Sequence, residues 1–289
     1  MSGATGFVGS HVARELREQG AEVRDERIDL LDGPGLERVV DGCEAVVHVA
    51  ALYSYSAPVA DFERVNVEGT KTILAAAKAK GVRRFLFTST AGTCGPVPGT
   101  SATEEDEPPD WELTVPYKRT KLESERLALA EGAVVVNPTT PVGEGDSKPT
   151  PTGKMIEDVA TGRIRGFVAT TGLNVVDVRD VARGHALALE HGEPSERYLL
   201  GAVNLSLEEL FAVIAGLAGR DRPRLRVPYP VAVAAAKAGL TNAEEVKLAR
   251  IPMYFSSQKA RSRLGYEPGP VEPALARATA EALKRKGGS

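Results

Sequence analysis

The sequence is poor in cysteine, has no large charge excess of either sign and contains no long hydrophobic run. Its two cysteines, Cys43 and Cys94, and its four histidines are too few for a disulfide framework and lack the spacing of a structural zinc site. We therefore expect no bound metal. A net charge of -3 excludes nucleic-acid binding by bulk positive charge, so no nucleic-acid partner is expected. The longest apolar stretch, 231–240, is interrupted by Lys237 and is too short to span a membrane.

The first residues do not read as a targeting segment, because Met1 to Ala4 contain neither a basic region nor an apolar core. Together with the scarcity of cysteine, this favours a cytoplasmic protein. The chain does have 42% hydrophobic and 26% charged residues, which is enough for a sizeable core. Its 289 residues suit one large domain that carries a smaller lobe.

Short β-branched runs alternate with longer helical patterns in the first half of the chain. Strands are predicted at 45–49, 84–88 and 133–137, with helices at 62–80 and 117–130 between them. This spacing implies parallel strands joined by right-handed crossovers. The predicted fold class is therefore α/β, with a doubly wound parallel sheet covered by helices on both faces.

The pattern changes near residue 140. We expect a core over 1–140, with strand returns near 168–190, and a smaller C-terminal lobe formed mainly by 141–289. Such a lobe would close over the carboxyl ends of the strands, where open α/β sheets bind ligands.

Glycines recur at a spacing of three in the first turn, at Gly3, Gly6 and Gly9, and a helical pattern follows at 10–19. This spacing lets a strand turn tightly into a helix and lets a pyrophosphate approach the backbone. A tight turn without a ligand is the alternative, because three glycines alone are weak evidence.

The segments around this glycine loop are shorter than a doubly wound sheet requires. Only Met1 and Ser2 precede the loop, and the second predicted strand, 21–24, runs almost directly into 25–30. We expect either that residues are missing before Gly3 and after Arg24 or that the chain is a short natural variant.

Tyr117 and Lys121 are spaced to share one face of a predicted helix. A free phenol titrates near 10, and a nearby ammonium lowers that pKa, which suits a general acid or base. Thr90 lies upstream at the end of a predicted strand, where its hydroxyl could donate to a substrate oxygen beside the tyrosine. Backbone capping is the alternative role for this hydroxyl.

The glycine loop, Thr90, Tyr117 and Lys121, in that order, resemble the extended short-chain dehydrogenase/reductase family, also called the NAD-dependent epimerase/dehydratase group. Other segments that resemble family motifs are His48-Val49-Ala50-Ala51, Asn66 in 64–70, Asp29-Leu30, the run from Asn137 to Gly143, and 176–182.

The resemblance implies a Rossmann-type sheet with a substrate-binding C-terminal lobe. Tyr117 would exchange the proton with the substrate oxygen, Lys121 would lower its pKa and hold the nicotinamide ribose, and Thr90 would hydrogen-bond the reacting oxygen. The implied cofactor contacts are Gly3, Thr5, Gly6, Phe7, Val8, Gly9, Arg24, Asp29, Leu30, Val49, Ala50, Ala51, Asn66, Thr88, Ser89, Tyr117, Lys121, Pro138, Thr139 and Thr140. The implied substrate contacts are Tyr53, Cys94 and Asn137.

The resemblance also implies an NAD(P)-dependent oxidoreductase that transfers a hydride at a carbonyl or alcohol carbon of a small molecule. Several segments are most similar to the dihydroflavonol 4-reductase-like branch and to the group called hopanoid-associated sugar epimerases. A nucleotide-sugar epimerase or dehydratase is one alternative, and a non-catalytic NAD(P)-binding sensor module is another. The arginines available for a sugar diphosphate are Arg163, Arg165, Arg222, Arg224 and Arg226.

Cofactor preference and assembly are implied less directly. Val23-Arg24 resembles the reductase pattern and favours NADP over NAD. Relatives dimerise through helices that correspond to 62–80 and 117–130, which implies a homodimer.

We also expect structural or solvated positions for three histidines and positions near the substrate for several aromatic residues. His48 reads as a structural strand residue, whereas His185 and His191 read as solvated positions on a surface helix. Trp111 and the run Tyr53-Ser54-Tyr55 are expected in loops near the substrate.

Overall fold

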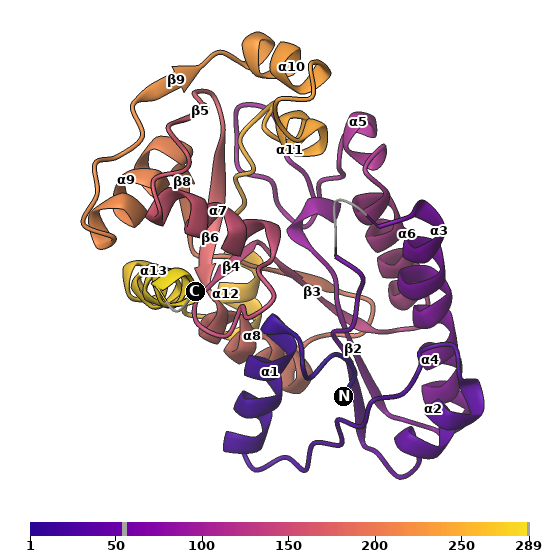
Figure 1. The fold of residues 1–289 in the computed structure, drawn as a ribbon. Helices are drawn as coiled ribbons and strands as arrows, with labels where there is room; N and C mark the ends of the chain where they lie inside the picture. Colours follow the sequence, from indigo (N-terminus) through magenta and orange to yellow (C-terminus); the bar gives the residue numbers. More distant parts are fainter. Residues whose placement is uncertain (54–56, 288–289) are drawn as a thin grey trace.

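The computed structural model describes residues 1–53 and 57–287 and has an α/β architecture (Figure 1). Ser54 and Tyr55 lie outside the described residues. The main sheet is parallel, with the strand order β1-β2-β3-β7. Its strands are β1 (Ala45–His48), β2 (Arg84–Thr88), β3 (Val134–Pro138) and β7 (Arg197–Leu200). The Rossmann-type class predicted from the sequence is confirmed.

Helices cover both faces of this sheet, because successive strand residues point to opposite sides. The covering helices are α1 (Phe7–Glu18), α2 (Gly33–Val40), α4 (Gly69–Ala79), α6 (Pro116–Ala130) and α8 (Val178–His191). Val47 and Leu86 pack with residues of α1 and α8. Their neighbours Val46 and Phe87 pack on the opposite face, against α2, α4 and α6.

A second sheet, of order β4-β6-β8, and a strand pair, β5-β9, form the C-terminal lobe. The strands are β4 (Thr140–Val142), β5 (Gly166–Val168), β6 (Gly172–Asp177), β8 (Val203–Ser206) and β9 (Leu225–Val227). The helices are α7 (Pro151–Ala160), α9 (Leu207–Leu217), α10 (Tyr229–Lys237), α11 (Ala243–Leu248) and α13 (Glu272–Gly287). Ser206 and Glu209 form a capping box that starts α9. The lobe has its own core, to which Phe167, Phe211 and Leu275 belong.

The chain returns from the lobe to the first core through α8 and β7. Strand β6 belongs to the lobe sheet, whereas β7 pairs with β3 in the main sheet. A short helix, α12 (Gln258–Leu264), packs on this core as well. Helix α8 overlaps the range 168–190 expected for the return, and strand β7 follows it at 197–200.

The helix predicted at 62–80 is interrupted. It consists of α3 (Val59–Phe62), a π-helical segment at Glu63–Glu68, and α4. The carbonyl of Asn66 accepts hydrogen bonds from the hydroxyls of Thr70 (2.6 Å) and Ser124 (2.8 Å). Single-turn π-helical segments of this kind are frequent at functional sites.

The strand predicted at 21–24 is not formed. Between α1 and α2 the described backbone has no strand, and Ser2 makes only an isolated bridge to His48. Because α1 and α2 lie on opposite faces of the sheet, this short segment has to pass the β1 edge, and it does so as a coil (Figure 1).

The described helices are short. The last one, α13, has 16 residues, and none of those in the described part is long and apolar enough to cross a membrane. Within residues 1–53 and 57–287, no group of three or more His, Cys, Asp or Glu side chains could hold a metal ion.

Candidate active site

The glycine loop is closed so tightly that side chains would not fit. A Cβ on Gly9 would lie 2.0 Å from the carbonyl oxygen of Gly3, and a Cβ on Gly3 would lie 2.6 Å from the amide of Ala50. Gly3 also has a φ of +74°, which favours glycine. Helix α1 begins directly after Gly6, and no side chain caps its first turn. Its free amides suit a phosphate group.

A cavity of about 510 Å³ extends from this loop to Tyr117. The predicted cofactor residues that line it are Gly3, Thr5, Gly6, Phe7, Val8, Gly9, Val49, Ala50, Ala51, Thr88, Ser89, Tyr117, Lys121, Pro138 and Thr139. Five further lining residues were not among the predicted cofactor contacts: Leu52, Val65, Pro141, Thr150 and Thr152. The closed glycine turn, the uncapped helix and the elongated cavity fit a dinucleotide. We call this space the cofactor cavity.

A second cavity, of about 400 Å³, adjoins the cofactor cavity and shares Gly3, Thr5 and Ala50 with it. Arg24, Asp29 and Leu30 line this second cavity. The guanidinium of Arg24 donates to the carbonyls of Val39 (3.3 Å) and Asp41 (2.8 Å) at the end of α2. The positively charged side chain predicted to select the cofactor is thus held at the cavity wall.

Tyr117 lies where the cofactor cavity meets a third cavity, and Thr90 and Tyr53 line both. The rings of Tyr53 and Tyr117 are 4.6 Å apart. Burial raises the pKa of Tyr117, Tyr53 adds to the rise, and a hydrogen bond with Thr90 offsets part of it. The net pKa of Tyr117 is therefore raised, because burial outweighs the hydrogen bond with Thr90.

Lys121 is buried one helical turn beyond Tyr117. Its ammonium donates to the carbonyl of Thr88 (2.7 Å) and lies 4.1 Å from the centre of the Phe87 ring. Burial lowers the pKa of Lys121 to about 7, against a smaller raising effect of Glu125. Near neutral pH this lysine is thus poised between its two protonation states.

His185 is buried, contrary to the expectation of a solvated position, while the side chain of His191 is half exposed. The Nδ1 of His185 donates to the carbonyl of Val181 (2.7 Å), so its Nε2 accepts from the hydroxyl of Thr88 (2.9 Å). His185 is buried because α8 packs on the main sheet with the side of the helix that carries this residue. His185 therefore holds the residue whose carbonyl receives Lys121.

His48 has the structural role predicted for it. Its ring joins the hydroxyl of Ser2 (2.6 Å) to that of Thr70 (3.1 Å), which ties the start of the glycine loop to α4. Burial lowers the pKa of His48 to about 3, with Lys121 as a lesser cause, so the ring stays neutral.

Four predicted site residues lie elsewhere than expected. Asn66 and Asn137 are buried behind the walls, and Cys94 packs with Ala91 in an apolar cluster. Asn66 holds the backbone of residue 52 instead of bordering the cofactor cavity. Thr140 lines the third cavity, not the cofactor cavity. Within the described chain, Cys94 and Asn137 border none of these three cavities, because other wall residues cover them.

A buried carboxylate that the sequence reading missed supports the Thr90 segment. Glu125, two helical turns after Tyr117, accepts hydrogen bonds from Thr93 (2.6 Å), Asn137 (2.7 Å) and Arg197 (2.8 Å). Asn137 also donates to the carbonyl of Thr90 (3.2 Å). The network joins α6, β3 and β7 beneath the wall that carries the catalytic candidates.

The third cavity, of about 370 Å³, lies between Tyr117 and the C-terminal lobe, and we call it the substrate cavity. Its apolar lining includes Met155, Ile164, Phe167, Leu173, Phe211 and Met253. Its charged lining residues are Lys118, Lys154, Asp158 and Glu245. None of the arginines singled out for a diphosphate borders this space in the described chain: Arg163 pairs with Glu157 and Asp158, and Arg222 and Arg226 pair with Glu208. Trp111 lies outside its lining among the described residues and stacks with Arg250.

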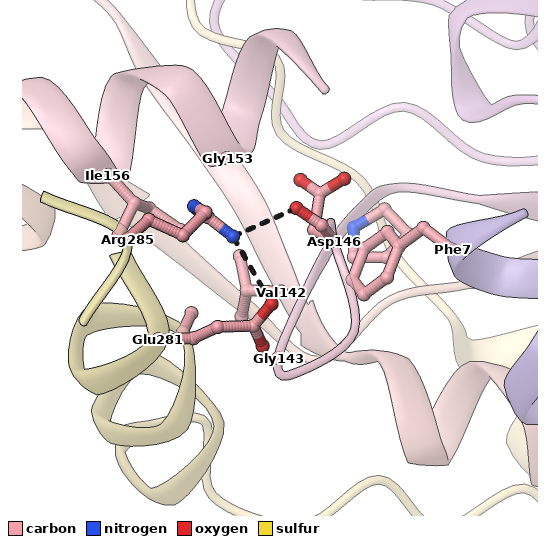
Figure 2. A pocket seen from close by; sticks show the side chains of 10 residues that line it. Phe7, Val142, Gly143, Asp146, Gly153, Ile156, Glu281 and Arg285 are labelled. Atoms are coloured by element: carbon pink, nitrogen blue, oxygen red, sulfur yellow. Dashed lines mark hydrogen bonds and ion pairs between the residues drawn. The ribbon is translucent and has the colours of Figure 1, made fainter. Parts of the chain in front are cut away.

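The C-terminal helix is fastened to the loop that precedes α7. Figure 2 shows Arg285 of α13 beside Asp146 and Glu281, with its guanidinium donating to the carbonyl of Asp146 (3.0 Å). Glu281 in turn accepts from the amide of Gly145 (2.7 Å). The space among these side chains, about 10 Å³, has room for a water molecule at most. This contact anchors the loop that ends at Thr150 on the cofactor cavity.

The glycine-loop cavity and the residues at its far end are those of an extended short-chain dehydrogenase/reductase. The chain belongs to the NAD dependent epimerase/dehydratase family, whose sequence model matches residues 1–201. A protein of Synechocystis sp. (strain ATCC 27184 / PCC 6803 / Kazusa), provisionally named a dihydroflavonol 4-reductase, is 33% identical over 96% of this chain and 92% of its own. Sterol demethylase protein B of Methylococcus capsulatus (strain ATCC 33009 / NCIMB 11132 / Bath) is 32% identical over 79% of this chain and 76% of its own.

Solved structures agree with this membership. The crystal structure of gox2253 has a TM-score of 0.86 and 37% identity, covering 99% of this chain and 97% of that one. A nucleoside-diphosphate-sugar epimerase from Pseudomonas aeruginosa has a TM-score of 0.81 and 26% identity, covering 99% and 97%. The chain is thus an NAD(P)-dependent oxidoreductase of this family.

Proposed function

We propose that the protein is an NAD(P)-dependent reductase that acts on a carbonyl group of an uncharged, mainly apolar molecule. The observation that carries this proposal is the substrate cavity, which has apolar walls and a balanced set of charges. Its two lysines are matched by two carboxylates, and Lys154 pairs with Asp158. A sugar diphosphate would need positive charge in excess, preferably arginine, to replace its hydration.

In this proposal the residues at the junction of the two cavities handle the proton. Tyr117 gives its phenolic proton to the substrate oxygen during reduction, and Thr90 orients the same oxygen by a hydrogen bond. Lys121, held by the carbonyl of Thr88, supplies positive charge near the tyrosine when protonated. The residues of the cofactor cavity would hold NAD(P), which supplies the hydride when bound.

We further propose that the protein divides its work between a core of 1–140 and a lobe of 141–289. The first part would bind the cofactor and the second would form most of the substrate cavity, since residues from Thr140 to Met253 make up the larger share of its lining. Part of the second range, α8 and β7, supports the core.

The proposal is tested by net oxidation of NADPH or NADH with a panel of apolar ketones. Tyr117→Phe should abolish turnover and spare cofactor binding, whereas the control Tyr254→Phe, in the lobe, should keep both. Epimerisation of a nucleotide sugar without net cofactor turnover would establish the epimerase alternative instead. Cofactor binding with neither activity would favour the sensor module.

For the cofactor, we propose a preference for NADP over NAD. Arg24 and Arg27 line the second cavity, and a guanidinium suits a ribose 2′-phosphate. Asp25, Glu26 and Asp29 line it as well, so the preference rests on the arginines outweighing acidic neighbours. Fluorescence titration with both dinucleotides tests this, and equal or tighter binding of NAD would refute it.

We also propose a homodimer formed through α3, α4 and α6. The π-helical segment that joins α3 to α4 packs against α6, so these elements form one side of the core (Figure 1). Val59, at the start of α3, is 52% exposed and adds apolar surface to this side. Light scattering after size exclusion should give about twice the chain mass of 30.6 kDa, and a single species at the chain mass would refute the dimer.

A further inference from the structure

A buried ion pair interrupts the apolar wall of the substrate cavity. Lys118 follows Tyr117 directly on α6, and Glu112 lies on the short helix α5 (Asp110–Leu113). The lysine side chain is 7% exposed and the glutamate side chain is fully buried. Their ammonium and carboxylate are in direct hydrogen-bonded contact.

The pair leaves hydrogen-bonding capacity unused. An ammonium has three donors, and among the described residues Glu112 is the hydrogen-bond acceptor of Lys118. The second carboxylate oxygen of Glu112, Oε1, is buried without a partner in the described part of the molecule. Such groups are costly to bury, because a desolvated charge needs several hydrogen bonds to offset the loss of water.

The position of the lysine points to the reacting end of the cavity. Its stem lies against Gly92, where an added Cβ would be 3.1 Å from Cε and 3.3 Å from Nζ. Gly92 follows Thr90 by two residues and belongs to the same short helical turn (Ala91–Thr93). Lys118, Thr90 and Tyr117 all line the substrate cavity. A charged donor therefore lines the same cavity as the two hydroxyls that receive the reacting oxygen.

Burial shifts both groups toward neutrality. It raises the pKa of Glu112 and lowers the pKa of Lys118, while each partner opposes the shift of the other. Because the carboxylate already balances the ammonium, an additional anion would leave the site with an excess negative charge. A neutral oxygen, such as a hydroxyl or a second carbonyl, accepts the remaining donors without this cost.

We propose that Lys118 is a specificity-determining residue, oriented by Glu112, whose ammonium hydrogen-bonds a second, neutral oxygen of the substrate. This inference rests on the proposed function and deepens it. The substrate class becomes apolar carbonyl compounds that carry a hydroxyl or another carbonyl near the reacting group. Among the charged residues that line the cavity, Lys118 is the one beside Tyr117 on α6, so it can distinguish such compounds from simple ketones.

Matched substrates that differ by a hydroxyl test the proposal. The pairs are benzoin with deoxybenzoin, and 2-hydroxycyclohexanone with cyclohexanone. A hydrogen bond to a charged donor corresponds to roughly a ten-fold preference or more in kcat/KM for the hydroxylated member. Wild-type protein without a preference in either pair would overturn the inference.

Two variants distinguish loss of the Lys118 hydrogen bond from loss of the folded structure. In Lys118→Met the preference should fall to about two-fold or less, with KM for the hydroxylated member rising and cofactor affinity unchanged. Because that variant leaves Glu112 unpaired, the double variant Lys118→Met with Glu112→Gln is the decisive one. Retention of the wild-type preference in a folded double variant would refute the role of Lys118.

A binding measurement keeps this outcome distinct from failure of the proposed function. Calorimetric titration of benzoin and deoxybenzoin into the NADP-bound protein reports recognition without turnover. Absence of reduction with a ten-fold binding preference that vanishes in the double variant would refute the reductase and support the role of Lys118. Reduction of both members at equal rates and with equal affinity would support the reductase and refute the role of Lys118.

Discussion

Replacing Glu125 by glutamine tests the buried network beneath the Thr90 segment. The substitution keeps the shape of the side chain but removes the charge that faces Arg197 and replaces one acceptor oxygen by an NH₂ donor. Thr93, Asn137 and Arg197 all donate to this carboxylate, so at least one donor would then face another donor. The perturbation is therefore electrostatic and local.

The expected loss can be estimated from the surroundings of Arg197. Removing one partner of a buried ion pair costs about 3–5 kcal/mol. Arg197 keeps hydrogen bonds to the carbonyls of Glu104 (2.8 Å) and Asp106 (2.9 Å), and its side chain is 15% exposed. We therefore expect the lower end, about 3 kcal/mol, which for a chain of 289 residues lowers Tm by roughly 5 °C.

Thermal unfolding followed by circular dichroism measures this loss. The control is Glu131→Gln, which breaks the pair with Lys78 between side chains that are 46% and 75% exposed, so its effect should stay within about 1 kcal/mol. If Glu125→Gln melts within about 1 °C of wild type, the network contributes little to stability, and the reasoning from burial is wrong.

Three further predictions concern the glycine loop, Lys121 and the buried histidines. Gly9→Ala places a Cβ 2.0 Å from the oxygen of Gly3 and should weaken NAD(P) binding at least ten-fold by fluorescence titration, whereas Gly216→Ala, with no atom within 4 Å, should leave binding unchanged. If protonated Lys121 is the active form, kcat should fall as the pH rises through about 7, and a flat profile would contradict this. The pKa values of His48 (about 3) and His185 (about 4) lie below the ordinary 6.5, so the unfolded chain binds more protons and stability should be lost from about pH 6.5 downward. Urea midpoints at pH 7.5 and pH 5 measure that loss, and equal midpoints would contradict it.

The sheet was predictable because its signals are local. Strands β1 and β3 are short valine-rich runs, β2 is a short run rich in phenylalanine and leucine, and helix α6 ends where its apolar pattern stops. The π-helical segment at Glu63–Glu68 was not predictable, because it depends on hydroxyls of Thr70 and Ser124 meeting the carbonyl of Asn66. The strand expected at 21–24 fails for a related reason, since pairing depends on neighbours that the local sequence does not specify.

The site residues divide in the same way. Those that occur in compact motifs, such as the glycine loop, Tyr117 and Lys121, lie together along the cofactor cavity. The burial of His185 was not predicted, because this residue belongs to no motif. Its spacing of four residues from Val181, on the apolar face of α8, would have indicated it. Glu125 offered no comparable signal, because Arg197 and Asn137 reach it from distant strands.

This division has a consequence for catalysis. The groups that would act on the substrate contact it with few atoms, so their precision depends on what fixes their backbone. Thr88 is held by His185 and receives Lys121, while Asn137 and Glu125 hold the segment of Thr90. These supports are buried and lie outside the cofactor cavity, so changes in them should alter kcat more than cofactor affinity. The type of reaction is encoded by local motifs, and its efficiency depends on buried polar contacts between segments far apart in the sequence.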